Sequence, residues 1–140
     1  MSGNFFLDTN IFVYAFESPA THKARRARQL ISEALKTRKG IISYQVVQEF
    51  FNVAFKRFAQ PISVPEAEQY FATVFRPILA IHSSPALYLE ALSLFGKLGF
   101  SWYDSLIVAA ATVSQCDVLY TEHLQDGRKI AGLLIQNPFS

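Results

Sequence analysis

The stretch NFFLDTNIFVYAF, residues 4–16, decides how this chain folds. Two phenylalanines and a leucine lead directly to Asp8, Thr9 and Asn10, and the chain then becomes apolar again. A short apolar run of this kind is typical of a buried strand. Its polar end indicates either the cap of a following helix or a site for a metal or a phosphate. If Asn10 provides the cap, the Asp8 carboxylate remains available for a ligand.

The rest of the chain alternates between short apolar runs and longer segments with helical periodicity. Strands are expected at residues 4–8, 40–44, 77–82, 117–121 and 132–139, and helices at 21–40, 45–59, 63–75, 84–97 and 102–115. Ser63 and Glu66 have the spacing of a capping box. This order predicts an α/β fold with three layers, in which helices cover both faces of a short, mainly parallel sheet. Ligands of such sheets bind beyond the carboxyl ends of the strands, where Asp8 lies.

Length and composition predict a single domain over residues 1–140. The chain is 51% apolar and 17% charged, which is more apolar than usual and indicates a large core or a surface covered by a partner. Cys116 is the only cysteine, so no internal disulfide can form and a reducing compartment is favoured. No apolar run is long enough to span a membrane, and no signal peptide is recognisable. We therefore expect a cytoplasmic protein.

Three acidic residues are candidates for a common site, and each also has a simpler interpretation. Asp8 follows the first strand. Glu49 belongs to a polar stripe at helical spacing with Gln45, Asn52 and Lys56, so it fits either a solvated face or the edge of a cleft. Asp104 lies in the first turn of the most apolar helix, where Ser101 would form a capping box with it. A carboxylate so close to the core is costly unless charge or donors compensate it.

Three acids on separate elements of a small α/β domain can together form a metal site. Unpaired carboxylates that share a site repel one another. Mg²⁺ and Mn²⁺ prefer oxygen ligands. A cluster of carboxylates that holds such ions can activate water and stabilise the leaving oxygen when a phosphodiester is hydrolysed.

Four segments together resemble the PIN domain, in particular the VapC-type toxins of bacterial toxin–antitoxin pairs. The segments are FFLDTNIFVYAF (5–16), SYQVVQEFFNV (43–53), WYDSLIVAAA (102–111) and LYTEHLQDG (119–127). The resemblance implies a metal-dependent ribonuclease in which Asp8, Glu49 and Asp104 hold Mg²⁺ or Mn²⁺ and Thr9 and Asn10 give polar support. It also implies an RNA substrate, a homodimer and a cognate antitoxin that covers the site.

The last of these segments departs from the family pattern. The family usually has Thr-x-Asp here, whereas this chain has Thr121, Glu122 and His123. The fourth acid is therefore replaced by histidine, unless Glu122 or Asp126 supplies a carboxylate. Imidazole tolerates Mn²⁺ more readily than Mg²⁺, so we expect a preference for Mn²⁺ if His123 occupies the fourth position.

Two surfaces are candidates for contacts with macromolecules. Seven of the 13 basic residues lie between Lys23 and Lys39, and such a cluster fits either a solvated helix face or a contact with phosphates. The candidates for a contact with RNA or an acidic antitoxin segment are Lys23, Arg25, Arg26 and Arg28. The helix that contains FFNVAFKRF (50–58) is apolar over more than half its circumference, which favours a homodimer.

Other classes of protein fit the sequence less well. A phosphoaspartyl enzyme of the haloacid-dehalogenase type needs a second Asp where Asn10 stands. A response-regulator receiver needs a lysine at the end of a late strand, and DVLYTEH (117–123) has none. The remaining alternative is a catalytically weak or inactive PIN-like module that binds RNA or a protein, because His123 replaces an acid.

Overall fold

The computed structural model describes residues 1–16 and 21–140. Over these residues, one six-stranded sheet has the order β3-β2-β1-β4-β6-β5. The strands are β1 (Phe5–Leu7), β2 (Gly40–Ser43), β3 (Leu79–Ile81), β4 (Val118–Tyr120), β5 (Lys129–Ile130) and β6 (Leu133–Gln136). Neighbouring strands are parallel except β5 and β6, which are antiparallel. This is the mainly parallel sheet that the sequence predicts.

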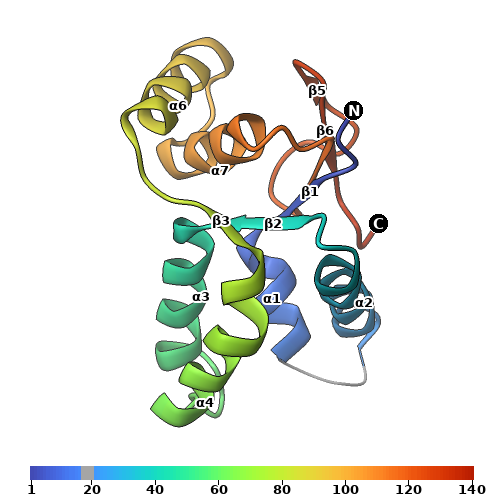
Figure 1. The fold of residues 1–140 in the computed structure, drawn as a ribbon, viewed down its shortest axis with the longest axis vertical. Helices are drawn as coiled ribbons and strands as arrows, with labels where there is room; N and C mark the ends of the chain where they lie inside the picture. Colours follow the sequence, from blue (N-terminus) through green and yellow to red (C-terminus); the bar gives the residue numbers. More distant parts are fainter. Residues whose placement is uncertain (17–20) are drawn as a thin grey trace.

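Helices cover both faces of the sheet and complete the predicted three layers (Figure 1). They are α1 (Thr9–Phe16), α2 (His22–Thr37), α3 (Tyr44–Lys56), α4 (Val64–Tyr70), α5 (Arg76–Ile78), α6 (Pro85–Leu98) and α7 (Trp102–Val113), with a π-helical turn η1 (Phe71–Phe75) after α4. The pair α6 and α7 lies on one face, and α1, α2, α3 and α4 lie on the other. None of the helices in the described ranges is both long and apolar enough to cross a membrane.

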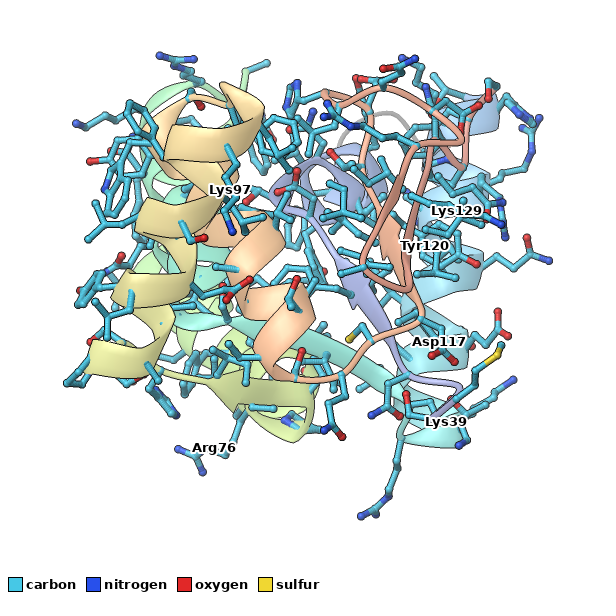
Figure 2. The ribbon with its side chains drawn as sticks, turned by 90° about the horizontal axis from the view of Figure 1, so that it is seen from above. Lys39, Arg76, Lys97, Asp117, Tyr120 and Lys129 are labelled. Atoms are coloured by element: carbon cyan, nitrogen blue, oxygen red, sulfur yellow. The ribbon has the colours of Figure 1, made fainter. Side chains whose placement is uncertain are left out.

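Strand β1 occupies the middle of the sheet. It pairs with β2 on one side and with β4 on the other, where Leu7 lies opposite Tyr120. Strands β2 and β3 are added on one side of β1, and β4, β6 and β5 lie on the other side. The strand order therefore changes direction between β1 and β4. Figure 2 labels Lys39 and Asp117, which precede β2 and β4 at one edge of the sheet, while Tyr120 ends β4 toward the opposite edge. In open α/β sheets, the carboxyl edge at such a reversal is where ligands bind.

The apolar face of α3 is used inside the chain. Phe50 is fully buried, and its ring centroid lies 5.2 Å from that of Phe75, 5.3 Å from that of Tyr70 and 5.6 Å from that of Phe16. Aromatic pairs at these separations stabilise a core beyond their buried area. Of the large apolar residues of α3, only Phe55 is exposed. The width of this apolar arc is therefore explained by the core and does not itself require a dimer.

Several details differ from the sequence-based expectation. Strand β5 is not among the expected strands, and the expected strand at residues 77–82 is shorter, because α5 extends to Ile78 before β3 begins. Helix α2 ends at Thr37, not at Gly40, and Arg38 adopts the left-handed conformation with a φ of 59°. Gly40 instead begins β2, where it packs closely against α2. A Cβ at this position would lie 2.1 Å from the Cβ of Ala34, so the close packing requires glycine. Helix α1 begins at Thr9, so Asn10 lies inside the helix and does not cap it. The capping box of Ser63 and Glu66 is present as predicted.

Candidate functional site

Asp8 lies directly beyond β1 and is held by its neighbours on three sides. Its backbone N–H donates to the carbonyl of Tyr120, which continues the pairing of β1 with β4. Its Oδ1 accepts a hydrogen bond from the backbone N–H of Thr9 at 2.7 Å, and its Oδ2 accepts one from the Thr121 hydroxyl at 2.8 Å. Asp8 is 5% exposed and Thr121 is fully buried. The carboxylate at this strand end is therefore fixed by the sheet itself.

Burial is the main influence on the charge of Asp8. It raises the pKa of this carboxyl above its ordinary value, and the negative charge of Glu49 adds to the increase. The hydrogen bonds from Thr121 and Thr9 oppose the increase without cancelling it. A buried carboxylate that remains under-compensated favours a cation or a proton beside it.

Glu49 lies on the second turn of α3, and two side chains orient its carboxylate. The Thr9 hydroxyl donates to Oε1 at 2.6 Å, and the Gln45 amide donates to Oε2 at 3.3 Å. The same Gln45 amide also donates to the backbone carbonyl of Tyr103 at 3.1 Å. Glu49 is therefore not a freely solvated residue of the polar stripe, and Gln45 connects it to the start of α7.

Asp104 is the residue that follows Tyr103, in the first turn of α7. Its backbone N–H donates to the Ser101 hydroxyl at 3.1 Å, so Ser101 caps the helix as expected. In the α4 capping box, by contrast, the Glu66 carboxylate accepts a hydrogen bond from the backbone N–H of Ser63. Only the Ser101 half of such a box is formed at α7, and Asp104 lines a cleft instead.

The three predicted acids line one cleft of about 320 Å³. Its walls are formed by Asp8, Thr9, Asn10, Gln45, Glu49, Asn52, Val53, Arg57, Asp104, Ile107 and His123. Lys56 of the predicted stripe is absent from the lining, and Arg57, which the sequence analysis did not consider, is present. The signal for Arg57 was its position four residues after Val53, another lining residue, because residues four apart lie one turn from each other on the same side of a helix.

The loop after β4 sends its polar side chains in different directions. His123 lines the cleft, and its Nε2 lies 2.8 Å from the Asn10 amide nitrogen. Glu122 is directed to Tyr14 and to Lys23, whose ammonium lies 2.6 Å from Oε2. Asp126 accepts from the backbone N–H of Asn137 at 2.8 Å. In this conformation neither Glu122 nor Asp126 adds a carboxylate to the cleft.

The basic residues of α2 lie outside the cleft lining. Lys23 is committed to the ion pair with Glu122, whose pKa stays below its ordinary value because hydrogen bonds from Lys23 and Tyr14 outweigh the effect of burial. Arg26 donates through Nε to the carbonyl of Pro138 at 3.4 Å. Arg25 and Arg28 are not among the lining residues either. Any contact of this helix with RNA or a protein would thus lie beside the site.

The donor types of the cleft fit a hard divalent cation. Carboxylate and amide oxygens are the ligands that Mg²⁺ and Mn²⁺ prefer. Across the two described ranges, however, no three His, Cys, Asp or Glu side chains are close enough to form a ready metal-binding group. The acids share the cleft but stand apart.

The fold and this cleft define a class of protein: an α/β domain with an acid-lined cleft at the carboxyl edge of a mainly parallel sheet. Within that class, the chain belongs to the PIN domain family, whose model matches residues 5–123. This match confirms the resemblance seen in the sequence. No match was found among curated protein sequences.

Solved structures with the same fold include several toxin–antitoxin proteins. A toxin–antitoxin complex from Klebsiella pneumoniae is 20% identical, with a TM-score of 0.70 over 97% of this chain and 98% of that chain. The sarcin-ricin loop cleaving toxin VapC20 of Mycobacterium tuberculosis is 18% identical, with a TM-score of 0.64 over 84% and 88%. VapBC2 from Rickettsia felis, bound to promoter DNA, is 21% identical, with a TM-score of 0.62 over 95% and 97%. At these identities the likeness establishes the fold.

We predict that Asp8→Asn stabilises the metal-free protein at neutral pH. Because the pKa of Asp8 is raised in the folded state, the folded chain binds more protons than the unfolded chain once the pH exceeds about 3.9, the ordinary pKa of Asp. The wild-type carboxylate therefore lowers the free energy of unfolding as the pH rises through the folded-state pKa. Asn keeps an oxygen for the Thr9 N–H and can donate to the Thr121 hydroxyl.

Urea unfolding in EDTA, from acid to neutral pH, measures this effect. The stability difference between Asp8→Asn and wild type should be largest at neutral pH and should shrink toward pH values of about 4 and below. Asp117→Asn is the control, because this acid lies at the opposite edge of the sheet. A variant no more stable than wild type at neutral pH would contradict the assigned cost of the buried charge.

Proposed function

We propose that this chain is a metal-dependent endoribonuclease and the toxin of a type II toxin–antitoxin pair. The observation that carries the proposal is that acids from β1, α3 and α7 line one cleft in a PIN domain. The structural neighbours support the choice of RNA, because they include a toxin–antitoxin complex and a toxin that cleaves the sarcin-ricin loop. The reaction is hydrolysis of a phosphodiester bond.

In this proposal Asp8, Glu49 and Asp104 hold Mg²⁺ or Mn²⁺. The ion supplies Lewis-acid stabilisation of phosphate oxygens and lowers the pKa of water bound to it. The chain positions the ligand groups: the Thr121 hydroxyl and the Thr9 backbone N–H each donate a hydrogen bond to the Asp8 carboxylate. The apolar side chains of Val53 and Ile107 form part of the wall and limit the access of bulk water.

The proposed protein partners are a cognate antitoxin and a second copy of this chain. Complexes of the structural neighbours with their antitoxins support the first. The outer side of α6 supports the second, because Leu89, Leu92 and Phe95 are 68%, 54% and 48% exposed. Exposed apolar residues in such a group are typical of an interface.

We predict that the chain is a dimer at micromolar concentration and that Leu92→Glu makes it monomeric. A charge placed within an apolar interface is costly unless it is paired. Static light scattering measures the mass directly. Glu90→Gln on the same helix is the control, and a monomeric wild type would end the proposal of a homodimer.

We predict that Asp8→Asn, Glu49→Gln and Asp104→Asn each reduce RNA cleavage by about a hundredfold or more, as expected when a preorganised electrostatic group is removed. Cleavage of single-stranded RNA in Mg²⁺ or Mn²⁺, with an EDTA arm, provides the measurement. Each variant removes one charge and preserves shape, so a folding defect is not expected.

Asp126→Asn is the matched control, because Asp126 lies outside the cleft and accepts from the Asn137 N–H. It should cleave RNA at the wild-type rate. Equal losses for Asp126→Asn and the three cleft variants would remove the special role of the cleft. EDTA-resistant cleavage would contradict the metal requirement.

The second candidate function is a catalytically weak or inactive PIN domain that binds RNA or a protein. It is favoured by His123, which faces the cleft where relatives have an acid, and by the separation of the three carboxylates. An imidazole contributes no negative charge to offset the lost hydration of a divalent ion.

We predict that wild-type cleavage is faster in Mn²⁺ than in Mg²⁺ and that His123→Asp raises the Mg²⁺-supported rate by about tenfold, because a carboxylate suits Mg²⁺ better than imidazole does. His82→Asp is the control, since His82 is exposed and absent from the cleft lining. An unchanged Mg²⁺ rate would show that residue 123 is not the fourth ligand position. No cleavage by wild type or by His123→Asp in either metal would favour the non-catalytic function.

A further inference from the structure

We propose that Arg57 binds a backbone phosphate of the RNA strand that enters the cleft, and so positions the substrate beside the acids. Arg57 caps the C-terminal end of α3 and is a lining residue of the same cleft as Asp8, Glu49 and Asp104. This assignment rests on the proposed function, since it names how that site holds its substrate.

Arg57 lies at the end of α3, on the side of the helix that Val53 occupies one turn earlier. At about 1.5 Å per residue, its backbone lies about 12 Å along the helix axis from that of Glu49. Side chains on a helix lean toward its N-terminus, so Arg57 leans back over the turn that contains Val53. Its backbone N–H donates to the carbonyl of Val53 at 2.7 Å, which continues the helical pattern to this residue.

The charge of Arg57 is not neutralised within the described chain. Within residues 1–16 and 21–140, the ion pair of Lys23 with Glu122 does not involve Arg57. The Arg57 guanidinium is exposed and forms no such pair, although three carboxylates line the same cleft. Among the lining residues, Arg57 is also the only one with a permanent positive charge. Arg57 is therefore the positive charge that could attract RNA to a cleft whose acids would otherwise repel its phosphates.

The chemistry of the guanidinium suits a phosphodiester. Its planar fork of N–H donors can make two parallel hydrogen bonds to the non-bridging oxygens of a phosphate. Asn52, which is exposed five residues before Arg57 and lines the same cleft, adds an amide donor of the kind that contacts phosphates. Phosphate contacts position a strand without reading its sequence, so Arg57 is expected to act on any single-stranded RNA.

The experiment measures RNA binding without cleavage, in the Asp8→Asn background and in EDTA. The probe is a fluorescently labelled single-stranded RNA of mixed sequence, titrated by anisotropy between about 50 and about 200 mM salt. The added substitutions are Arg57→Met, Arg57→Lys and, as a matched control, Lys56→Met. Lys56 is the adjacent exposed cation of α3 and does not line the cleft.

We expect Arg57→Met to weaken RNA binding about tenfold, the effect of losing one charge-assisted contact. It should also reduce the slope of log affinity against log salt by about 0.7, the value for one phosphate on a single strand. Arg57→Lys should keep the slope and lose part of the affinity, because the charge remains and the fork does not. Lys56→Met should change the affinity by less than about twofold.

Equal behaviour of Arg57→Met and Lys56→Met, or no measurable RNA binding by the parent, would overturn the assignment. Cleavage by the otherwise wild-type chain in Mg²⁺ and Mn²⁺ is measured separately. Cleavage that Arg57→Met leaves unchanged would overturn the role of Arg57 and leave the ribonuclease proposal standing. An inactive wild type whose binding still depends on Arg57 would overturn the ribonuclease proposal and leave the phosphate contact standing.

Discussion

A continuous series of hydrogen bonds across the end of β1 is the constraint on which the cleft depends. Thr121 holds one oxygen of Asp8, the backbone of Thr9 holds the other, and the Thr9 hydroxyl then reaches Glu49. Gln45 continues the series to the start of α7. Because residues at the ends of β1 and β4 and on α1, α3 and α7 contribute to it, the positions of Asp8 and Glu49 are set by the sheet and the helices together. Sites built on rigid elements in this way keep their geometry.

The same arrangement places stability and function in opposition. The core packs efficiently around α7 and Phe50, but the carboxyl edge of the sheet holds Asp8 as a buried carboxylate whose pKa is raised by burial. A buried charge of this kind lowers the stability of the free protein. In the proposed function the same charge is what would attract a cation, and Arg57 is what would attract a polyanion. Loss of stability at a functional site is a common trade-off in proteins.

Most of the fold could be predicted from local sequence signals, whereas the grouping of the three acids in one cleft was predicted from strand-end reasoning and the family resemblance and not from periodicity. The apolar runs before Asp8 and after Cys116 identify β1 and β4, and the uninterrupted apolar character of α7 identifies a central helix. Helical periodicity could not decide whether Glu49 faces solvent or a cleft, because that depends on Thr9, forty residues earlier. Arg57 was missed because helical spacing places its neighbour Lys56, and not Arg57, on nearly the same side of α3 as Glu49. Only the tertiary structure shows that Arg57 lines the cleft.

The position of β1 between β2 and β4 has a consequence for the order in which the molecule can be assembled. The strand at residues 5–7 finds its first partner near residue 40 but its second only near residue 118. Contacts between distant parts of a chain form late, because a long loop must close first. During synthesis, Asp8 therefore emerges long before Thr121 exists to hold it. The cleft therefore remains unassembled on the ribosome until the segment around Thr121 has been made and has left the exit tunnel.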